Sequence, residues 1–166
     1  MKVRLIIPVL LTLLVQRMLG MPGLPSWTGE VLLPMVWVVA SALMVRERGW
    51  PWEALTLGIV WDLLLEPVVG PGGIAWSAAG LALYALAGVV ADRSARAWIG
   101  FGVVGAVVVL IAHYLALLPL GLAPSFTASH LIRTAIFTGV WCGLVKIVVA
   151  LNLPSQWRAY RVRKLR

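Results

Sequence analysis

Five ionisable side chains of this 166-residue chain are expected to be buried within apolar stretches: Asp62, Glu66, His113, Arg133 and Lys146. A charged group at the centre of a bilayer costs at least about 2.5–3.5 kcal/mol, so each must face protein, water or a counter-charge rather than lipid. The set contains acids and bases, whose charges can cancel in pairs. Two interpretations follow: the groups form ion pairs that fix the helix register, or they line a path for protons or substrate. We favour pairing, because a path needs a continuous relay of such groups.

Spacing predicts which of these groups meet. Asp62 and Glu66 are four residues apart, so they share one face of a helix. Counted at about 1.5 Å per residue from the centre of each apolar stretch, Asp62 lies near mid-bilayer and Glu66 about 6 Å further out. We therefore expect one layer with Asp62 and Lys146, and another with Glu66 and either His113 or Arg133. For Lys146 and Arg133, long stems that reach toward the nearer interface are the alternative.

The residues required for known intramembrane catalysis are missing from the pattern. An aspartyl protease needs two aspartates on facing helices, but Asp92 is expected in a loop, far from Asp62. His113, His130 and the single Cys142 are too few for a metal site. No Gly-rich loop with a lysine is present to bind phosphate. We expect no catalytic activity, no cofactor and no metal.

The composition places these residues in a membrane. The chain is 61% hydrophobic and 12% charged, with a mean hydropathy of +0.97. Soluble domains have about 25% charged residues. The net charge of +8 would suggest nucleic acid in a soluble protein. Here it indicates topology, because Lys and Arg accumulate on cytoplasmic loops, and we expect no nucleic-acid partner.

Six apolar stretches approach the length of about 20 residues that spans a bilayer. They are residues 3–20, 30–45, 53–70, 74–91, 98–119 and 130–151. The first has no small-residue cleavage site after it, so we expect it to be retained as a helix. The second is short, and the third and fourth can be read as one hairpin, so five spans is the alternative. The sequence predicts a six-helix transmembrane domain over 1–153 and a basic cytoplasmic tail over 154–166.

The basic residues set the expected orientation. Eleven of the 14 fall before or at the start of the first stretch, between the second and third, between the fourth and fifth, or after the sixth. The intervening loops, 20–29, 71–73 and 120–129, contain none. Because basic loops stay in the cytoplasm, both termini are expected there. The tail is also expected to contact anionic lipids of the inner leaflet.

Small residues indicate where two helices approach closely. Ala135, Gly139 and Gly143 recur at four-residue spacing and so share one helix face. Such spacing is common in membrane bundles. We interpret it as internal packing, with a partner interface as the alternative.

One stretch carries a resemblance to a known family. Gly58, three intervening residues, Asp62-Leu63-Leu64, a short spacer, and Pro71-Gly72-Gly73 precede a helix rich in small residues. This order resembles the signature of the rod shape-determining MreD family. The resemblance is strongest over residues 54–91. It departs at Glu66-Pro67, where small polar residues are more usual.

The resemblance implies a non-enzymatic scaffold of the bacterial cell-elongation complex in the inner membrane. It implies direct binding of MreC. Through MreC it implies links to MreB filaments, to RodA and its class B penicillin-binding protein, and so to peptidoglycan synthesis. It also implies an all-α six-transmembrane-helix bundle similar to the substrate-binding subunits of energy-coupling-factor transporters.

That similarity supplies the alternative function, a substrate-binding membrane subunit of a vitamin-type transporter. Such subunits present alanines at four-residue spacing on the first helix, whereas residues 5–15 contain no alanine here. We therefore favour the scaffold. The candidates for structure or partner binding are Gly58, Asp62, Glu66, Pro71, Gly72, His113, Arg133, Gly139, Gly143 and Lys146.

Overall fold

The computed structural model describes residues 6–21, 29–45, 50–90, 92–123 and 127–164, without the side chains of 6–8, 45, 50–52 and 152–164. All regular structure in these ranges is helical, with no strand. The expected all-α fold is therefore confirmed. The basic residues before residue 6, those within 46–49 and the side chains of the basic tail lie outside the described part.

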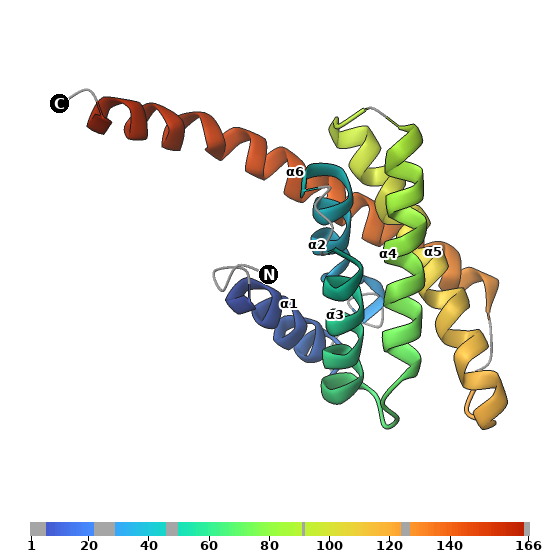
Figure 1. The fold of residues 1–166 in the computed structure, drawn as a ribbon. Helices are drawn as coiled ribbons and strands as arrows, with labels where there is room; N and C mark the ends of the chain where they lie inside the picture. Colours follow the sequence, from blue (N-terminus) through green and yellow to red (C-terminus); the bar gives the residue numbers. More distant parts are fainter. Residues whose placement is uncertain (1–5, 22–28, 46–49, 91, 124–126, 165–166) are drawn as a thin grey trace.

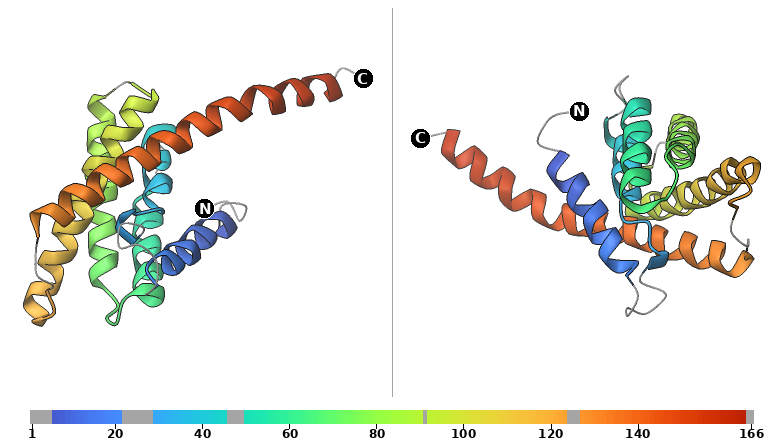
Figure 2. Two further views of the ribbon diagram at one scale, coloured as in Figure 1. Left: turned by 180° about the vertical axis from the view of Figure 1, so that it is seen from behind. Right: turned by 90° about the horizontal axis from the view of Figure 1, so that it is seen from below.

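The helices follow one another in a simple order (Figure 1). They are α1 (Ile6–Leu19), α2 (Met35–Ala40), α3 (Trp50–Leu65), α4 (Pro71–Val89), α5 (Ala95–Leu117) and α6 (Ala128–Lys164). A π-helical turn, Ser41–Val45, prolongs α2, and a 3-10 turn, Leu118–Leu120, follows α5. α6 crosses the bundle obliquely and then runs on past it (Figure 2).

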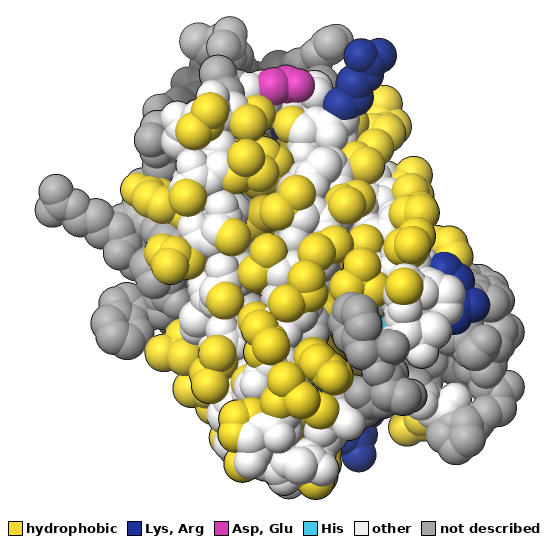
Figure 3. Space-filling view, turned by 90° about the vertical axis from the view of Figure 1, so that its right-hand side faces the viewer, with side chains coloured by type: hydrophobic (Ala, Val, Ile, Leu, Met, Phe, Trp, Pro, Cys, Tyr) yellow, Lys and Arg dark blue, Asp and Glu magenta, His cyan; other side chains and the backbone are white. Residues whose placement is uncertain are grey.

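Three helical segments in the described ranges are long and apolar enough to cross a membrane: Pro71–Val89, Ala95–Leu120 and Ala128–Leu151. Val9–Leu19 and Met35–Met44 are apolar but shorter. Large apolar side chains on α4, α5 and α6 are exposed, among them Leu81, Ile111 and Ile136. Hydrophobic side chains cover the middle of the face in Figure 3, and the few charged ones lie toward its periphery. The chain is a helical membrane protein, because lipid is the surrounding that such a surface requires.

The core lies between α2, α4 and α5. Met35 and Val39 of α2 are fully buried, and so are Trp76 and Leu83 of α4, with Phe101 of α5 almost so. α4 packs against α3 on one side and α5 on the other, and α5 packs against α6. Because consecutive helices from α3 to α6 are neighbours joined by short connections, their directions alternate. The end of α3, the start of α4, the end of α5 and the start of α6 therefore meet at one end of the bundle.

Glycines set the distance between α5 and α6. A methyl group at Gly102 would come within 2.9 Å of the Gly139 Cα atom, and one at Gly139 within 2.6 Å of Val103. A methyl group at Gly143 would lie 2.5 Å from Ile99. These contacts are shorter than side chains tolerate, so Gly139 and Gly143 pack inside the bundle against α5.

Two helices differ from the predicted boundaries for identifiable reasons. α3 ends at Leu65, not at residue 70, because Pro67 disfavours helical geometry at Glu66. Residues 30–45 are α-helical only from Met35. At the other end of the chain, α6 continues without a break through residue 154 to Lys164, although we expected a separate tail there.

The irregular segment before α2 is held by side chains of other helices. The Leu32 amide donates to Thr138 Oγ1 (3.0 Å), and the Leu33 amide donates to Gln16 Oε1 (2.8 Å). Trp141 Nε1 donates to the Leu33 carbonyl (3.2 Å). Non-helical backbone at membrane depth is tolerated only where protein or a cavity satisfies its polar groups. α1 and α6 therefore replace the hydrogen bonds that a longer α2 would have made.

α5 begins outside the apolar zone with a conventional cap. Ser94 Oγ accepts the Ala97 amide (3.4 Å), and the Ser94 hydroxyl and amide donate to the Asp92 carboxylate at 2.7 and 2.8 Å. These two hydrogen bonds lower the pKa of Asp92. The connection between α4 and α5 is thus polar, as expected for a loop that leaves the membrane.

Candidate functional site

Asp62 lies in the last turn of α3 and is fully buried. Its carboxylate accepts three backbone amides at the start of α4. The Gly70 amide donates to Oδ2 at 2.7 Å, the Gly72 amide lies 2.9 and 3.0 Å from the two oxygens, and the Gly73 amide donates to Oδ2 at 3.3 Å. Asp62 therefore caps the helix that follows its own.

This cap satisfies every orphan donor of α4. The first N–H groups of a helix have no partner within it, and Pro71 has no N–H to satisfy. The first intrahelical bond here runs from the Ile74 amide to the Gly70 carbonyl (3.1 Å). The amides of Gly70, Gly72 and Gly73 all reach Asp62, and the helix dipole favours its negative charge. Hydrogen bonds and a dipole thus stabilise this buried carboxylate without a basic residue.

Glycines allow the cap to form. A side chain at Gly58 would overlap the Gly72 carbonyl oxygen and approach the Gly73 Cα atom to 2.8 Å, and one at Gly72 would overlap the Asp62 carboxylate. Gly70 has a φ of 128°, a region that only glycine adopts readily. We call Gly58, Asp62 and residues 70–73 the α3–α4 corner. Its members depend on one another sterically.

The predicted pair of Asp62 with Lys146 is not formed. Lys146 Nζ instead lies 5.6 Å from the centre of the Trp98 ring, near the start of α5. The start of α5 and the start of α4 lie at opposite ends of the bundle, because the two helices are antiparallel neighbours. Asp62 is also not central in its helix, since α3 ends three residues later. The two charges are therefore stabilised separately.

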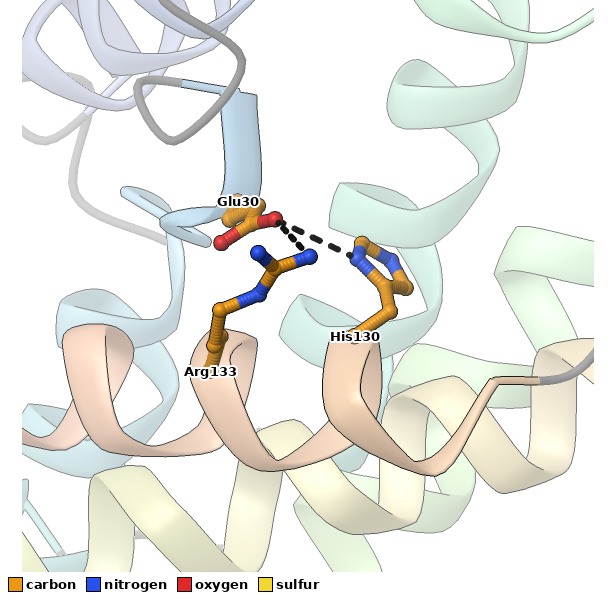
Figure 4. A network of polar contacts seen from close by, with 3 residues as sticks. All are labelled: Glu30, His130 and Arg133. Atoms are coloured by element: carbon orange, nitrogen blue, oxygen red, sulfur yellow. Dashed lines mark ion pairs between the residues drawn. The ribbon is translucent and has the colours of Figure 1, made fainter.

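Arg133 also has a partner other than the predicted Glu66. Its guanidinium lies 3.0 Å from Glu30 Oε1, and His130 Nδ1 lies 3.8 Å from the same oxygen (Figure 4). The Glu30 side chain is only 8% exposed, whereas those of His130 and Arg133 are 53% and 56% exposed. The cluster joins the irregular segment before α2 to the first turns of α6.

Sequence reasoning missed Glu30. It is the first residue of the second apolar stretch. A usable signal was present in α6, where His130 and Arg133 are three residues apart and share a face. Two basic side chains on one face of a membrane helix require an acid, and Glu30 was one of the acids without an assigned partner.

A cavity of about 370 Å³ lies where α3 and α5 end and α4 and α6 begin. Its polar lining residues are Glu66, His113, Tyr114, Thr127 and His130. Its apolar walls include Trp61 and Trp76, whose ring centres are 5.4 Å apart with planes tilted by 51°. Glu66 and His113, which were expected to lie in one layer, thus line the same cavity. No hydrogen bond joins them. His113 Nε2 is buried and has no partner in the described part.

The cavity brings a few polar groups together within mostly apolar walls. It offers one carboxylate, two imidazoles, a phenol and a hydroxyl, set in aromatic and aliphatic walls. Within the described ranges, no group of three or more His, Cys, Asp or Glu residues could hold a metal ion. A small number of polar groups in a mostly apolar cavity is typical of ligand recognition.

Comparisons with known proteins add no relative. No family model matches the chain, and no curated protein and no solved structure matches it either. Function is therefore inferred from the α3–α4 corner, the cavity and the membrane-exposed surface.

Proposed function

We propose that the chain is a non-enzymatic scaffold of the MreD type in the bacterial inner membrane. In this role it binds MreC directly. It shares a complex with MreB, RodA and a class B penicillin-binding protein, and helps couple cytoplasmic filaments to peptidoglycan synthesis. One observation supports this proposal above others. The residues that carry the resemblance, Gly58, Asp62, Pro71 and Gly72, are the residues that build the α3–α4 corner.

The corner gives that resemblance a physical basis. A glycine four residues before an aspartate lets α4 approach α3, and the aspartate then reaches the amides that Pro71 and the glycines leave free. The spacing of Gly58, Asp62 and Pro71-Gly72-Gly73 is what this corner requires, so it is not a chance arrangement. A rigid hairpin of this kind suits a scaffold, which must hold a surface in place rather than move.

The proposed topology has six spans and both termini in the cytoplasm. α4, α5 and the first part of α6 have the necessary length. α1, α2 and α3 would be the shorter spans, with the irregular segment at 29–34 completing the second. The continuation of α6 to Lys164 would place the basic tail along the inner leaflet, where each cation contributes about 1 kcal/mol.

Co-purification tests the scaffold directly. The full chain, co-expressed with MreC of the same bacterium, should retain it through affinity purification in mild detergent. The chain should also restore rod shape to cells that lack their own copy. A folded chain that neither retains MreC nor restores shape would overturn the proposal.

A second function is favoured by the cavity alone. A substrate-binding subunit of a small-molecule transporter requires such a cavity between helices, and the polar groups Glu66 and His113 line this one. Cells without the chain would then keep their rod shape but lose uptake of one nutrient. That phenotype, with no retention of MreC, would select the transporter subunit over the scaffold.

A further inference from the structure

We infer that the cavity between α3, α4, α5 and α6 binds a protonated amine that carries a compact apolar or aromatic body. The inference concerns the cavity alone and does not depend on the scaffold proposal. A scaffold could also bind a small ligand or a lipid headgroup in this cavity. The test of the inference therefore measures binding, not cell shape.

The charge of the cavity selects a cation. Asp62, the acid in the last turn of α3, is fully engaged by the amides at the start of α4. Glu30 is engaged by Arg133. Glu66 is the acid that lines the cavity, and within the described ranges its carboxylate has neither a hydrogen bond nor an ion pair. The cavity therefore contains a carboxyl group that no basic side chain of the described ranges pairs with.

The aromatic walls favour the same ligand. Trp61 and Trp76 both line the cavity, and their ring planes are tilted by 51° to each other rather than stacked. Cations bind over aromatic faces, and tryptophan is the strongest of these acceptors. A carboxylate beside indole rings recognises an ammonium group more readily than a neutral or anionic group of the same shape.

A histidine nitrogen without a partner narrows the range of amines that fit the cavity. His113 Nε2 is buried without a hydrogen-bond partner, a state that costs stability until a donor or acceptor reaches it. A protonated primary or secondary amine has N–H donors for both the Glu66 carboxylate and this nitrogen. A quaternary ammonium has none, so it should bind more weakly than an amine of equal size.

The volume sets the size of the body. About 370 Å³ is near the lower end of the 300–1,000 Å³ typical of ligand sites. It suits a single-ring amine or the ethanolamine headgroup of a phospholipid. Both sources share the same chemistry, and the lipid composition of the membrane distinguishes them.

The probe is 2-phenylethylamine, titrated at pH 8 into the full chain in nanodiscs made only of phosphatidylglycerol. Calorimetry gives the affinity, and empty nanodiscs correct for partition into lipid. The matched ligands are 2-phenylethanol, which lacks the charge, and the N,N,N-trimethyl derivative, which lacks the N–H groups. We expect the amine to bind about tenfold or more tightly than the alcohol. Equal affinity for the amine and the alcohol would overturn the inference.

The variant Glu66→Gln locates the site. It should weaken amine binding about tenfold or more, because it removes the charge but keeps the shape. Glu53→Gln is the matched control, since Glu53 lies on α3 and does not line the cavity; the affinity of this variant should equal that of the unmodified chain. An unchanged affinity in Glu66→Gln would overturn the assignment. If Glu66→Gln does not fold, the amine-to-alcohol ratio on the unmodified chain decides.

Lipid composition identifies the natural source. If phosphatidylethanolamine in the nanodisc competes with the probe, and only when Glu66 is present, the occupant is a lipid headgroup. If the probe binds equally in both membranes, the occupant is a free amine. Competition that persists in Glu66→Gln would place the amine elsewhere and overturn the inference.

Discussion

At the scale of single residues, three carboxylates near one end of the bundle have three different surroundings. Asp62 accepts backbone amides, Glu30 pairs with Arg133, and Glu66 faces the cavity. The surroundings depend on the element that faces each carboxylate. Asp62 faces the start of α4 with its unsatisfied amides, Glu30 faces a guanidinium, and Glu66 faces open space. The consequences of substitution should differ accordingly.

Asp62→Ala should destabilise the protein by about 3 kcal/mol or more. It leaves the amides of Gly70, Gly72 and Gly73 buried and unsatisfied, and each costs about 1–3 kcal/mol. Asp62→Asn should cost less, because its carbonyl oxygen still accepts one or two of these amides. Unfolding by SDS in mixed micelles measures both. Equal losses for Asn and Ala would contradict the cap.

A second substitution tests whether Lys146 takes part in the cap. Lys146→Met should cost about 0.5–1 kcal/mol, the value of a cation over Trp98. Because Lys146 does not contact Asp62, the losses of Asp62→Asn and Lys146→Met should add to within about 0.5 kcal/mol. Recovery of stability in the double variant would instead show an ion pair between them.

Arg133→Met should destabilise the junction between α2 and α6 by about 1–3 kcal/mol. It leaves the Glu30 carboxylate buried without its counter-charge. The loss is smaller than for a fully buried pair, because Arg133 is half-exposed and water can reach it. Glu30→Gln in the same chain should recover most of the loss in the same unfolding measurement. A double variant as unstable as Arg133→Met alone would show that Glu30 is not the partner.

At the scale of helices, the α3–α4 corner is set by close approach of two backbones. Gly58→Ala should cost about 1–3 kcal/mol, because its methyl group meets the carbonyl of Gly72, which cannot move aside. Gly100→Ala on α5 is the matched control, since a methyl group there meets nothing within 4 Å. It should be neutral or stabilise by up to about 1 kcal/mol through helix propensity. Similar losses at both positions would contradict a specific contact at Gly58.

The sequence predicts the helices better than their polar contacts. Apolar stretches locate α3 to α6, and the order Gly58, Asp62, Pro71-Gly72-Gly73 marks the hairpin correctly. The predicted partner of Asp62 was wrong for a physical reason. Depth was counted from the middle of residues 53–70, whereas Glu66-Pro67 ends the helix early and brings Asp62 to its end. Pairing by charge also overlooks backbone amides, which are absent from any list of ionisable side chains.

At the scale of the whole molecule, the alternating directions of α3 to α6 bring three polar features to one end. The α3–α4 corner, the Glu30–His130–Arg133 cluster and the cavity lie where α4 and α6 begin. The loops at this end, 71–73 and 120–129, contain no basic residue. The opposite end has the connection with Arg93 and Arg96. Basic residues face the cytoplasm, so the cavity end should face outward.

Reporter fusions test this orientation. Fusions after Glu47, Asp92 and Arg166 should all report the cytoplasm, and fusions after Ser26 and Ser125 should report the outer side of the membrane. The reason is the bias of 11 of the 14 basic residues toward alternate connections, which acts on each short loop during insertion. A fusion after Asp92 is the informative control, because α4 on its N-terminal side and α5 on its C-terminal side are both long enough to span. An outward signal at Asp92 would invert the bundle and place the cavity at the cytoplasmic end. Agreement at Asp92 with an outward signal at Arg166 would instead show that α6 does not cross, and the six-span topology would be wrong.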